Sequence, residues 1–247
     1  MINSPINLPF GLSVEVIEKQ RTDKWYRDRW GKITSSRLPD INKPKGLGET
    51  GINYLNSLLY QRICGEPTEM QIQNMEQDLS WEVKNGKKYE PEARERLGEQ
   101  LGVTIEECEF KPYPGLEMSG DSSDGIFQYQ GVTIPVEIKS TAQPNTSIKR
   151  MQLVTGKHGD FYQIQGHILA WEAPFAIYAV FDYAANKLDW QVVMRSEIHI
   201  NKIIASITSG NELIEKALKL GLRSVADDEN MVETYKQIKN LPNVKLS

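Results

Sequence analysis

The stretch GDSSDGIFQYQGVTIPVEIKS, residues 120–140, carries the residue types whose spacing could do chemistry. Glu137 and Lys139 are two positions apart in a strand-like run, so their side chains would project from the same face of that strand. Asp124 precedes a predicted hairpin that turns at Gly131, and the returning strand would bring Glu137 beside it. The pattern therefore predicts two carboxylates and one ammonium group side by side.

Such a cluster is suited to a divalent metal ion. Two carboxylates and a backbone carbonyl, that of Ile138, are the hard oxygen ligands that Mg²⁺ or Mn²⁺ prefers. The metal would polarise a phosphodiester and lower the pKa of a water molecule, while Lys139 would position that water and offset the negative charge of the transition state. The chemistry that we expect at this site is phosphodiester hydrolysis.

Two alternatives stay open on these residues alone. An E-x-K triplet on a strand is more commonly a salt bridge on a solvated face, but the apolar run VTIPVEI and the acidic turn before it favour a metal site for Glu137 and Lys139. Asp121 competes with Asp124 as a metal ligand, because it lies earlier on the same turn. The Asp-Gly pair at 124–125 favours Asp124.

The elements that must hold this cluster follow from the period of the apolar residues. Helical patterns cover residues 5–29, 54–63, 70–101, 159–171, 197–220 and 232–238, and strand patterns cover 103–110, 119–141, 175–183 and 188–195. The Gly-Glu-Pro triplet at 65–67 should end the second helix, and Pro91 is difficult to place inside a helix because proline favours the first turn. This order predicts an α/β (α+β) fold with a central mixed β-sheet flanked by helices.

Composition and charge limit the class of protein. The chain has 247 residues, 39% hydrophobic and 25% charged, as expected for one compact globular domain. A net charge of −4 argues against a generally basic protein that coats DNA, yet residues 19–45 hold nine Lys or Arg and three Asp. The sequence shows neither a secretory signal nor the roughly 18 apolar residues of a membrane span, so we expect a cytoplasmic protein without a membrane partner.

The cysteines and histidines lack the spacing of metal ligands. We expect Cys64 and Cys108 to be small core residues that form no disulfide bond. We expect His158, His167 and His199 to be structural or surface residues, because a magnesium site prefers oxygen ligands. Of the three, His158 is the best placed to touch DNA.

Four motifs, in order, resemble those of the PD-(D/E)XK nucleases, and within them the lambda-exonuclease or YqaJ-type viral recombinase family. They are RWGKITSS at 29–36, NGKKYEPEARERL at 85–97, SSDG at 122–125 with VEIK at 136–139, and YQIQGHILAW at 162–171. The resemblance spans more than half of the chain and implies a restriction-endonuclease-like core. The part after about Met194 has no counterpart in it.

The resemblance implies roles for residues that local chemistry leaves unassigned. Arg29 and Ser36 would bind the 5′ phosphate of a DNA end, and without the resemblance they are a surface arginine and a helix cap. Glu90 would be a further catalytic carboxylate and metal ligand, where it would otherwise be an ordinary acid near a helix start. Gln163 would act in catalysis and Gln165 would contact the 5′ phosphate, since side chains two apart on a helix diverge by roughly 200°.

The resemblance also implies an activity, that of a metal-dependent 5′→3′ exonuclease that degrades one strand of linear double-stranded DNA from a 5′-phosphorylated end. It implies a role in phage-type recombination in a bacterial host cytoplasm, a ring-shaped homotrimer and a single-strand annealing protein as partner. Within one nuclease domain, 1–247, we expect a DNA-end-binding part (1–65), a catalytic core (66–195) and a C-terminal helical appendage (196–247). The alternatives are a structure- or sequence-specific endonuclease of the same fold and a non-catalytic DNA-binding accessory protein.

Overall fold

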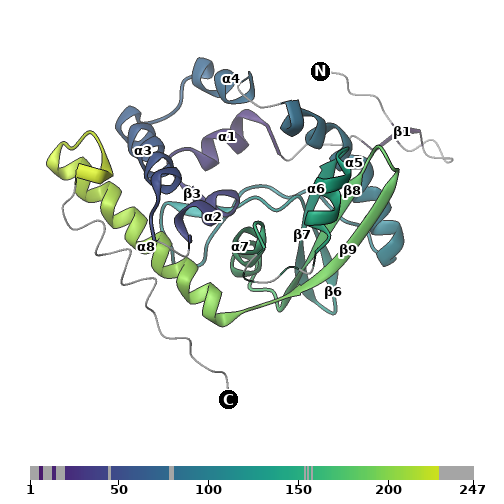
Figure 1. Cartoon of the computed structure of the whole chain (residues 1–247). Coiled ribbons are helices and arrows are strands. Elements are labelled where there is room, and N and C mark those ends of the chain that lie inside the picture. Colours follow the sequence, from purple (N-terminus) through teal and green to yellow (C-terminus); the bar gives the residue numbers. More distant parts are fainter. Residues whose placement is uncertain are drawn as a thin grey trace.

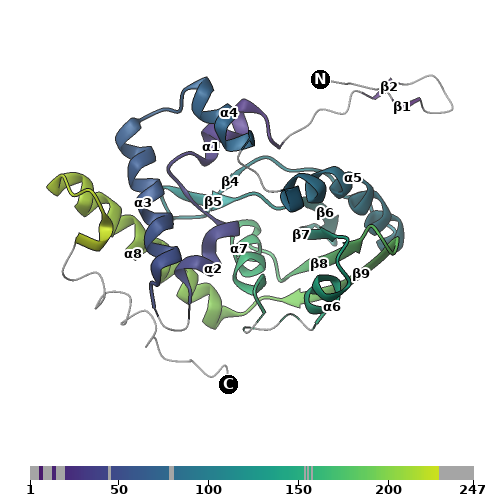
Figure 2. The same ribbon diagram turned by 45° about the horizontal axis from the view of Figure 1, so that its top comes forward.

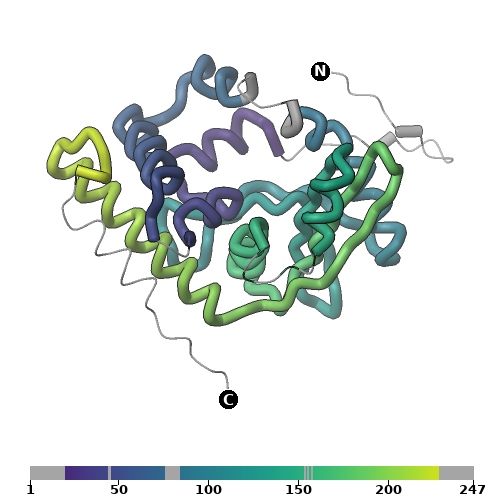
Figure 3. The backbone as a smooth tube through the Cα atoms, viewed as in Figure 1, coloured from purple at the N-terminus to yellow at the C-terminus, as the bar shows by residue number. Residues whose placement is uncertain are grey.

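The computed structural model describes residues 6–7, 13–14, 20–43, 46–77, 81–152, 154, 156 and 158–227, and Figure 3 draws the others in grey. The helix predicted at 232–238 lies outside the described residues. Among the described helices, none combines the length and the apolar character that are needed to cross a membrane.

The central sheet has four strands in the order β6-β7-β8-β9. They are β6 (Gly125–Tyr129), β7 (Val132–Thr141), β8 (Phe175–Asp182) and β9 (Lys187–Met194). Strands β7 and β8 are parallel, whereas β6-β7 and β8-β9 are antiparallel pairs, so the sheet is mixed as predicted. Parallel neighbours need a crossover, and α6 (Pro144–Arg150) and α7 (Phe161–Trp171) supply it.

Helices cover both faces of this sheet because the strands carry apolar residues on both. On one face, Val136 and Ile138 pack in the same cluster as Leu97 of α5 (Trp81–Leu101). On the other face, Tyr178 of β8 packs in a second cluster with Ile164 of α7. The residues of β7 that alternate with Val136 and Ile138 therefore face α7.

A smaller sheet joins distant parts of the sequence. Strand β5 (Ser119–Asp121) pairs in parallel with β3 (Ile33–Thr34) and antiparallel with β4 (Lys111–Pro112). Figure 2 shows β4 and β5 apart from the four-stranded sheet. Because Thr34 lies opposite Gly120, the next residues along, Ser35 and Asp121, come together. This pairing places the RWGKITSS segment beside the turn that carries Asp124.

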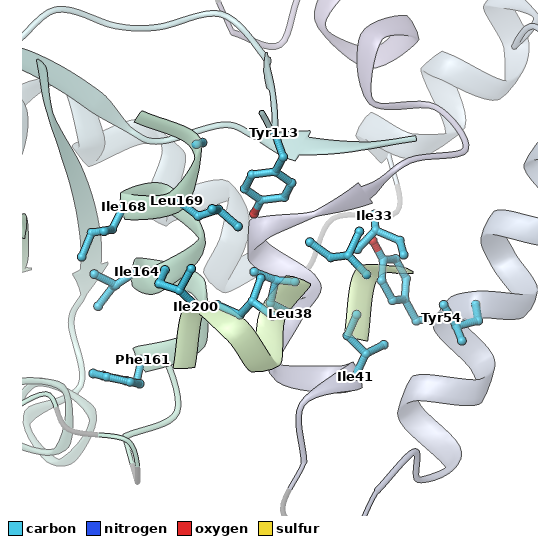
Figure 4. Close-up of a cluster of buried hydrophobic side chains, with 14 of the residues drawn as sticks. Ile33, Leu38, Ile41, Tyr54, Tyr113, Phe161, Ile164, Ile168, Leu169 and Ile200 are labelled. Carbon is cyan, nitrogen blue, oxygen red and sulfur yellow. The ribbon is translucent and has the colours of Figure 1, made fainter. Parts of the chain in front are cut away.

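Helices α2 (Leu38–Ile41) and α8 (Glu197–Leu220) pack against α7, and α3 (Glu49–Cys64) packs against both of them. Figure 1 shows α7 between α2 and α3 on one side and strands β7 to β9 on the other. In Figure 4, Leu38, Ile164 and Ile200 from three of these helices belong to one buried cluster. The stretch expected as a C-terminal appendage therefore contributes to the main core through α8.

The helix predicted over residues 5–29 is present in only half of its described part. Only α1 (Asp23–Arg29) is helical, and β1 (Ile6–Asn7) and β2 (Ser13–Val14) are short strands paired with each other. The helix begins at Asp23 because Thr22 caps it, with Thr22 Oγ1 accepting a hydrogen bond from the Trp25 N–H at 3.2 Å.

Two other predicted segments differ from the structure. The strand expected at 103–110 is reduced to a single bridge between Glu106 and Ile126. The helix expected at 70–101 is present as α4 (Glu69–Gln77) and α5, and Pro91 lies inside α5 without ending it. The helix α6 was not predicted.

The end of α3 lies where the sequence predicts it, but its last turn is not in the core. Gly65 ends the helix with φ +74°, a conformation that glycine adopts without strain. Cys64 is exposed, which corrects its expected core position, because the last turn of α3 extends beyond the cluster around α7. Cys108 is buried, and both thiols are free as predicted.

Candidate active site

Glu137, Lys139 and Gln163 are in direct contact at the centre of the site. Strand β7 presents Glu137 and Lys139 toward α7, which carries Gln163. Glu137 Oε1 lies 2.5 Å from Lys139 Nζ, Lys139 Nζ donates to Gln163 Oε1 at 3.0 Å, and Gln163 Nε2 donates to Glu137 Oε1 at 2.8 Å. The glutamine thus orients both members of the E-x-K pair.

The E-x-K pair is not a salt bridge on a solvated strand face. Glu137 is only 1% exposed, and Lys139 is largely covered. Burial alone would lower the pKa of Lys139, but the negative charges of Glu137, Asp160 and Asp124 outweigh it and raise the pKa to about 12. Lys139 is therefore a cation at neutral pH.

Asp124 lies beside β7, where the hairpin prediction places it. The hairpin turns at Gln130 and Gly131, which both have positive φ, as the tightest turns between strands require. Asp124 Oδ2 accepts a hydrogen bond from the Ile138 N–H at 2.7 Å, and the Asp124 N–H donates to the Val136 carbonyl at 3.0 Å. The carboxylate is thereby fixed against the strand that carries Glu137.

The two carboxyl groups have opposite pKa shifts. Burial, followed by the charges of Glu137 and Glu90, raises the pKa of Asp124 well above its ordinary value, and Lys139 offsets this only in part. For Glu137, burial would also raise the pKa, but the charge of Lys139 and the hydrogen bonds from His167 and Lys139 hold it below its ordinary value. In the absence of a cation, the charged form of Asp124 is therefore disfavoured, whereas that of Glu137 is stabilised.

Glu90 lies close enough to Asp124 to affect its pKa, but its own carboxylate is paired with arginines. Arg94 Nη2 lies 2.7 Å from Glu90 Oε1, and Arg21 Nη2 is hydrogen bonded to Glu90 Oε2. Burial raises the pKa of Glu90 although both arginines act to lower it. Arg94 Nε also donates to the Asp124 carbonyl at 2.9 Å, which ties α5 to the carboxylate turn.

The carboxylates of Asp124 and Glu137 and the carbonyl of Ile138 are oxygen ligands of the kind that a divalent cation prefers. Within the described part of the chain, no three His, Cys, Asp or Glu side chains converge tightly enough to hold a metal ion by themselves. A cation held by Asp124 and Glu137 would therefore need a further oxygen ligand, either the expected backbone carbonyl of Ile138 or a Glu90 released from its arginines. A cation bound beside Asp124 would stabilise the charged form of this carboxyl group, which the protein alone disfavours.

His167 is a buried structural residue, one of the two roles expected for it, and its contacts connect it to the carboxylates of the site. It is fully buried on α7, with Nε2 2.6 Å from Glu137 Oε2 and Nδ1 2.5 Å from Asp121 Oδ1. Burial would lower its pKa, but the charges and hydrogen bonds of Asp121 and Glu137 raise the pKa to about 10. A sequence signal existed: His167 follows Gln163 by four residues, so both lie on one helix face.

Asp121 does not occupy the position of Asp124. It is fully buried, receives a hydrogen bond from Ser35 Oγ and another from Ser123 Oγ at 2.5 Å, and contacts His167. These partners take up both of its carboxylate oxygens. Asp121 is thus held against His167 and the two serines, whereas Asp124 lies against β7 beside Glu137, so Asp124 stays the expected metal ligand.

Arg29 and Ser36 lie together at the surface near this network. Arg29 Nη2 is 3.5 Å from Ser36 Oγ, and the guanidinium carbon lies 4.2 Å from the centre of the Trp25 ring. Ser36 is exposed and Arg29 is partly exposed, so a ligand can reach both. Their neighbour Ser35 bonds to Asp121, which links this segment to the carboxylates.

Gln165 points away from the site, which argues against its expected contact with a 5′ phosphate. Its side chain is fully buried; Nε2 donates to the Met194 carbonyl at 2.8 Å and Oε1 accepts from the Ser196 N–H at 2.9 Å. Both polar atoms are therefore used to hold the end of β9 and the start of α8. His199 contacts Ser196 in the same region, and His158 stacks edge-on against Tyr178.

The fold matches solved structures of exonucleases. No protein-family model and no curated protein sequence matches the chain. An alkaline exonuclease from Laribacter hongkongensis is 20% identical with a TM-score of 0.68 over 81% of this chain and 95% of that one, and its complex with dAMP gives 21% and 0.69 over the same shares. A phage-related exonuclease from Haemophilus somnus is 13% identical with a TM-score of 0.58 over 77% of this chain and 96% of that one. The chain therefore has the fold of these exonucleases, as its resemblance to the lambda-exonuclease family implies.

Proposed function

We propose that this chain is a Mg²⁺-dependent deoxyribonuclease that degrades one strand of linear double-stranded DNA in the 5′→3′ direction from a 5′-phosphorylated end. The observation that carries the proposal is the convergence of Asp124, Glu137, Lys139 and Gln163 at one point of β7. The exonuclease fold and the four motifs support it. Mn²⁺ should replace Mg²⁺, because both prefer the same oxygen ligands.

The residues of the site would have different roles in hydrolysis. Asp124, Glu137 and the Ile138 carbonyl would hold the metal, and Glu90 would join them if Arg21 and Arg94 release it. Mg²⁺ in this position supplies positive charge that polarises the phosphate and makes a water molecule more acidic. Lys139 would orient that water and offset the negative charge of the transition state.

The preference for a 5′ end would come from Arg29 and Ser36. A planar guanidinium and a hydroxyl at the surface suit a terminal phosphate, to which they can donate several hydrogen bonds. The β3-β5 pairing holds this segment at a fixed position relative to Asp124. A DNA end bound by Arg29 would thus present a nearby phosphodiester to the carboxylates.

The wider setting follows from the resemblance to the lambda-exonuclease family. We propose a homotrimeric ring around the DNA, a single-strand annealing protein as partner, and a role in phage-type recombination in the cytoplasm of a bacterial host. Light scattering of the purified chain at several concentrations measures the oligomeric state, and a monomer at all concentrations would contradict the ring.

One degradation assay separates the candidate activities. A linear duplex with one 5′-phosphorylated, labelled end is incubated with the chain in Mg²⁺ or in a chelator, next to a closed circular duplex. Progressive release of mononucleotides from the 5′ end supports the exonuclease, and discrete fragments from the circle support the endonuclease of the same fold. DNA binding without cleavage under any divalent metal would support the non-catalytic accessory protein.

A further inference from the structure

The two oxygens of Glu137 have separate partners. Oε1 contacts Lys139 and Gln163, which have roles in the proposed reaction. Oε2 contacts His167 Nε2 at 2.6 Å, on the side away from Lys139. Because a carboxylate is planar, fixing Oε2 also fixes the direction in which Oε1 and its lone pairs point. The position of His167 therefore sets the orientation of Glu137.

His167 is in turn held by an acceptor that has no freedom to move. Its Nδ1 contacts Asp121 Oδ1, and Asp121 also receives hydrogen bonds from Ser35 and Ser123. All four of these side chains are buried, and Ser35 Oγ lies 2.5 Å from the hydroxyl of Tyr113. Each polar group in the network has a partner, which makes such a network rigid.

The network also fastens α7 to the N-terminal segment. A Cβ atom at Gly166 would lie 2.8 Å from Ser35 Oγ and 2.7 Å from the Tyr113 hydroxyl, so only glycine allows this close approach. Ser35 immediately precedes Ser36, the proposed phosphate contact. A continuous path of hydrogen bonds therefore connects the segment that holds Ser36 to Glu137.

We propose that His167, anchored by Asp121, is a positioning residue that orients Glu137 for metal binding and fixes it to the segment that carries Ser36. The proposal rests on the proposed function for the identity of the metal site. The pair Asp121 and His167 touches neither the proposed metal nor DNA, and it acts through Glu137. Groups that orient a metal ligand in this way typically change metal affinity or activity by about 10- to 100-fold when they are removed.

Two substitutions of His167 separate positioning from packing. In His167→Gln the amide nitrogen can reach Glu137 as Nε2 does, whereas in His167→Asn the shorter amide can reach Asp121 but not Glu137. Mn²⁺ affinity is measured by titration calorimetry on the full chain, together with kcat and KM on 5′-phosphorylated duplex. We expect His167→Asn to weaken Mn²⁺ binding and lower kcat by about 10- to 100-fold at unchanged KM, and His167→Gln to retain most of both.

A matched control is His199→Asn, because His199 lies on α8 and contacts Ser196 instead of a carboxylate. It should leave Mn²⁺ affinity unchanged. Equal Mn²⁺ affinity in wild type and His167→Asn overturns the proposal, and so does an equal loss in His167→Asn and His167→Gln. Circular dichroism and thermal melting show whether each variant is folded.

If neither His167 variant folds, Asp121→Asn decides the question, since it keeps the shape of the anchor and removes its charge. A weakened Mn²⁺ affinity in Asp121→Asn supports the proposal, and an unchanged one overturns it. The calorimetry needs no DNA, so a wild-type chain that binds Mn²⁺ but cleaves no DNA contradicts the proposed function alone. A wild-type chain that binds no Mn²⁺ overturns the positioning role as well.

Discussion

Asp124 lies just before β6 and Glu137 lies on β7, the two strands of one hairpin, and the surroundings of the two carboxylates differ. Glu137 is surrounded by donors from Lys139, Gln163 and His167, which hold its pKa below the ordinary value. The pKa of Asp124 is raised well above its ordinary value, by burial and then by the charges of Glu137 and Glu90. One carboxylate is thus charge-balanced and the other is not.

This difference shows how one site can serve both stability and function. The balanced carboxylate, Glu137, contributes to a fixed network that the protein can form without any ligand. The ionised form of the unbalanced one, Asp124, is unfavourable in the metal-free protein, and under the proposed function a cation that pairs with it would stabilise the folded state. A carboxyl group with a strongly shifted pKa is typical of functional centres.

The largest effect is expected from Lys139→Ala, which removes the cation that makes Glu137 differ from Asp124. Without the ammonium group, the transition state loses a positive charge that offsets its negative charge, and kcat should fall by roughly 10²- to 10³-fold. Binding of a DNA end should persist, because Arg29 and Ser36 are untouched. Nucleotide release and a gel-shift assay measure the two properties, and undiminished release would mean that the site is misplaced.

Removal of the divalent metal should lower both activity and stability. At a metal concentration of about 100 times the dissociation constant, binding stabilises the folded state by about 2.7 kcal/mol. Thermal melting of the wild type in Mn²⁺ and in a chelator measures this difference. Asp124→Asn should show a much smaller shift between the two conditions, and a full shift would place the cation elsewhere.

Two variants, measured without metal, test the difference between the carboxylates most directly. Their free energies of unfolding should change in opposite directions. Asp124→Asn removes the unbalanced charge and keeps an oxygen for the Ile138 N–H, so it should raise the free energy of unfolding by about 1 kcal/mol. Glu137→Gln removes the charge that Lys139 and His167 face, so it should lower that free energy by roughly 2 kcal/mol. Chemical denaturation in a chelator measures both, and equal signs would contradict the division between the two carboxylates.

The smallest effects should separate Gln163 from Gln165 on the same helix. Gln165→Ala leaves the Met194 carbonyl and the Ser196 N–H without their partner and should cost about 1 kcal/mol of stability with little change in kcat. Gln163→Ala should instead lower kcat, because Lys139 loses the acceptor that orients it. Melting temperature and kcat are recorded for both variants. A loss of kcat in Gln165→Ala would mean that Gln165 contributes to catalysis.

Much of the central sheet could be predicted because its signals are local. The strands at 119–141, 175–183 and 188–195 follow from apolar alternation and turn residues, and α7 and α8 follow from helical periodicity. The wrong predictions fall where the tertiary structure outweighs the local sequence pattern. The segment 103–110 has strand-like residues, but it forms only the bridge at Glu106 and therefore no regular strand.

Within the site, the sequence by itself determined which groups share a face. The two-residue spacing of Glu137 and Lys139 fixes their common direction on any strand, and the turn at Gly131 fixes the return of the hairpin past Asp124. These relations depend on backbone geometry over a few residues, which every chain obeys.

Only the tertiary structure decided what surrounds that face. The burial of Glu137, the pairing of Glu90 with Arg21 and the contact of Ser35 with Asp121 join residues that are far apart in the sequence. No local period encodes these contacts, because they depend on how α5, α7 and the β3-β5 pair pack around β7. For the same reason His167 became a member of the site only when its partners at Asp121 and Glu137 were in place.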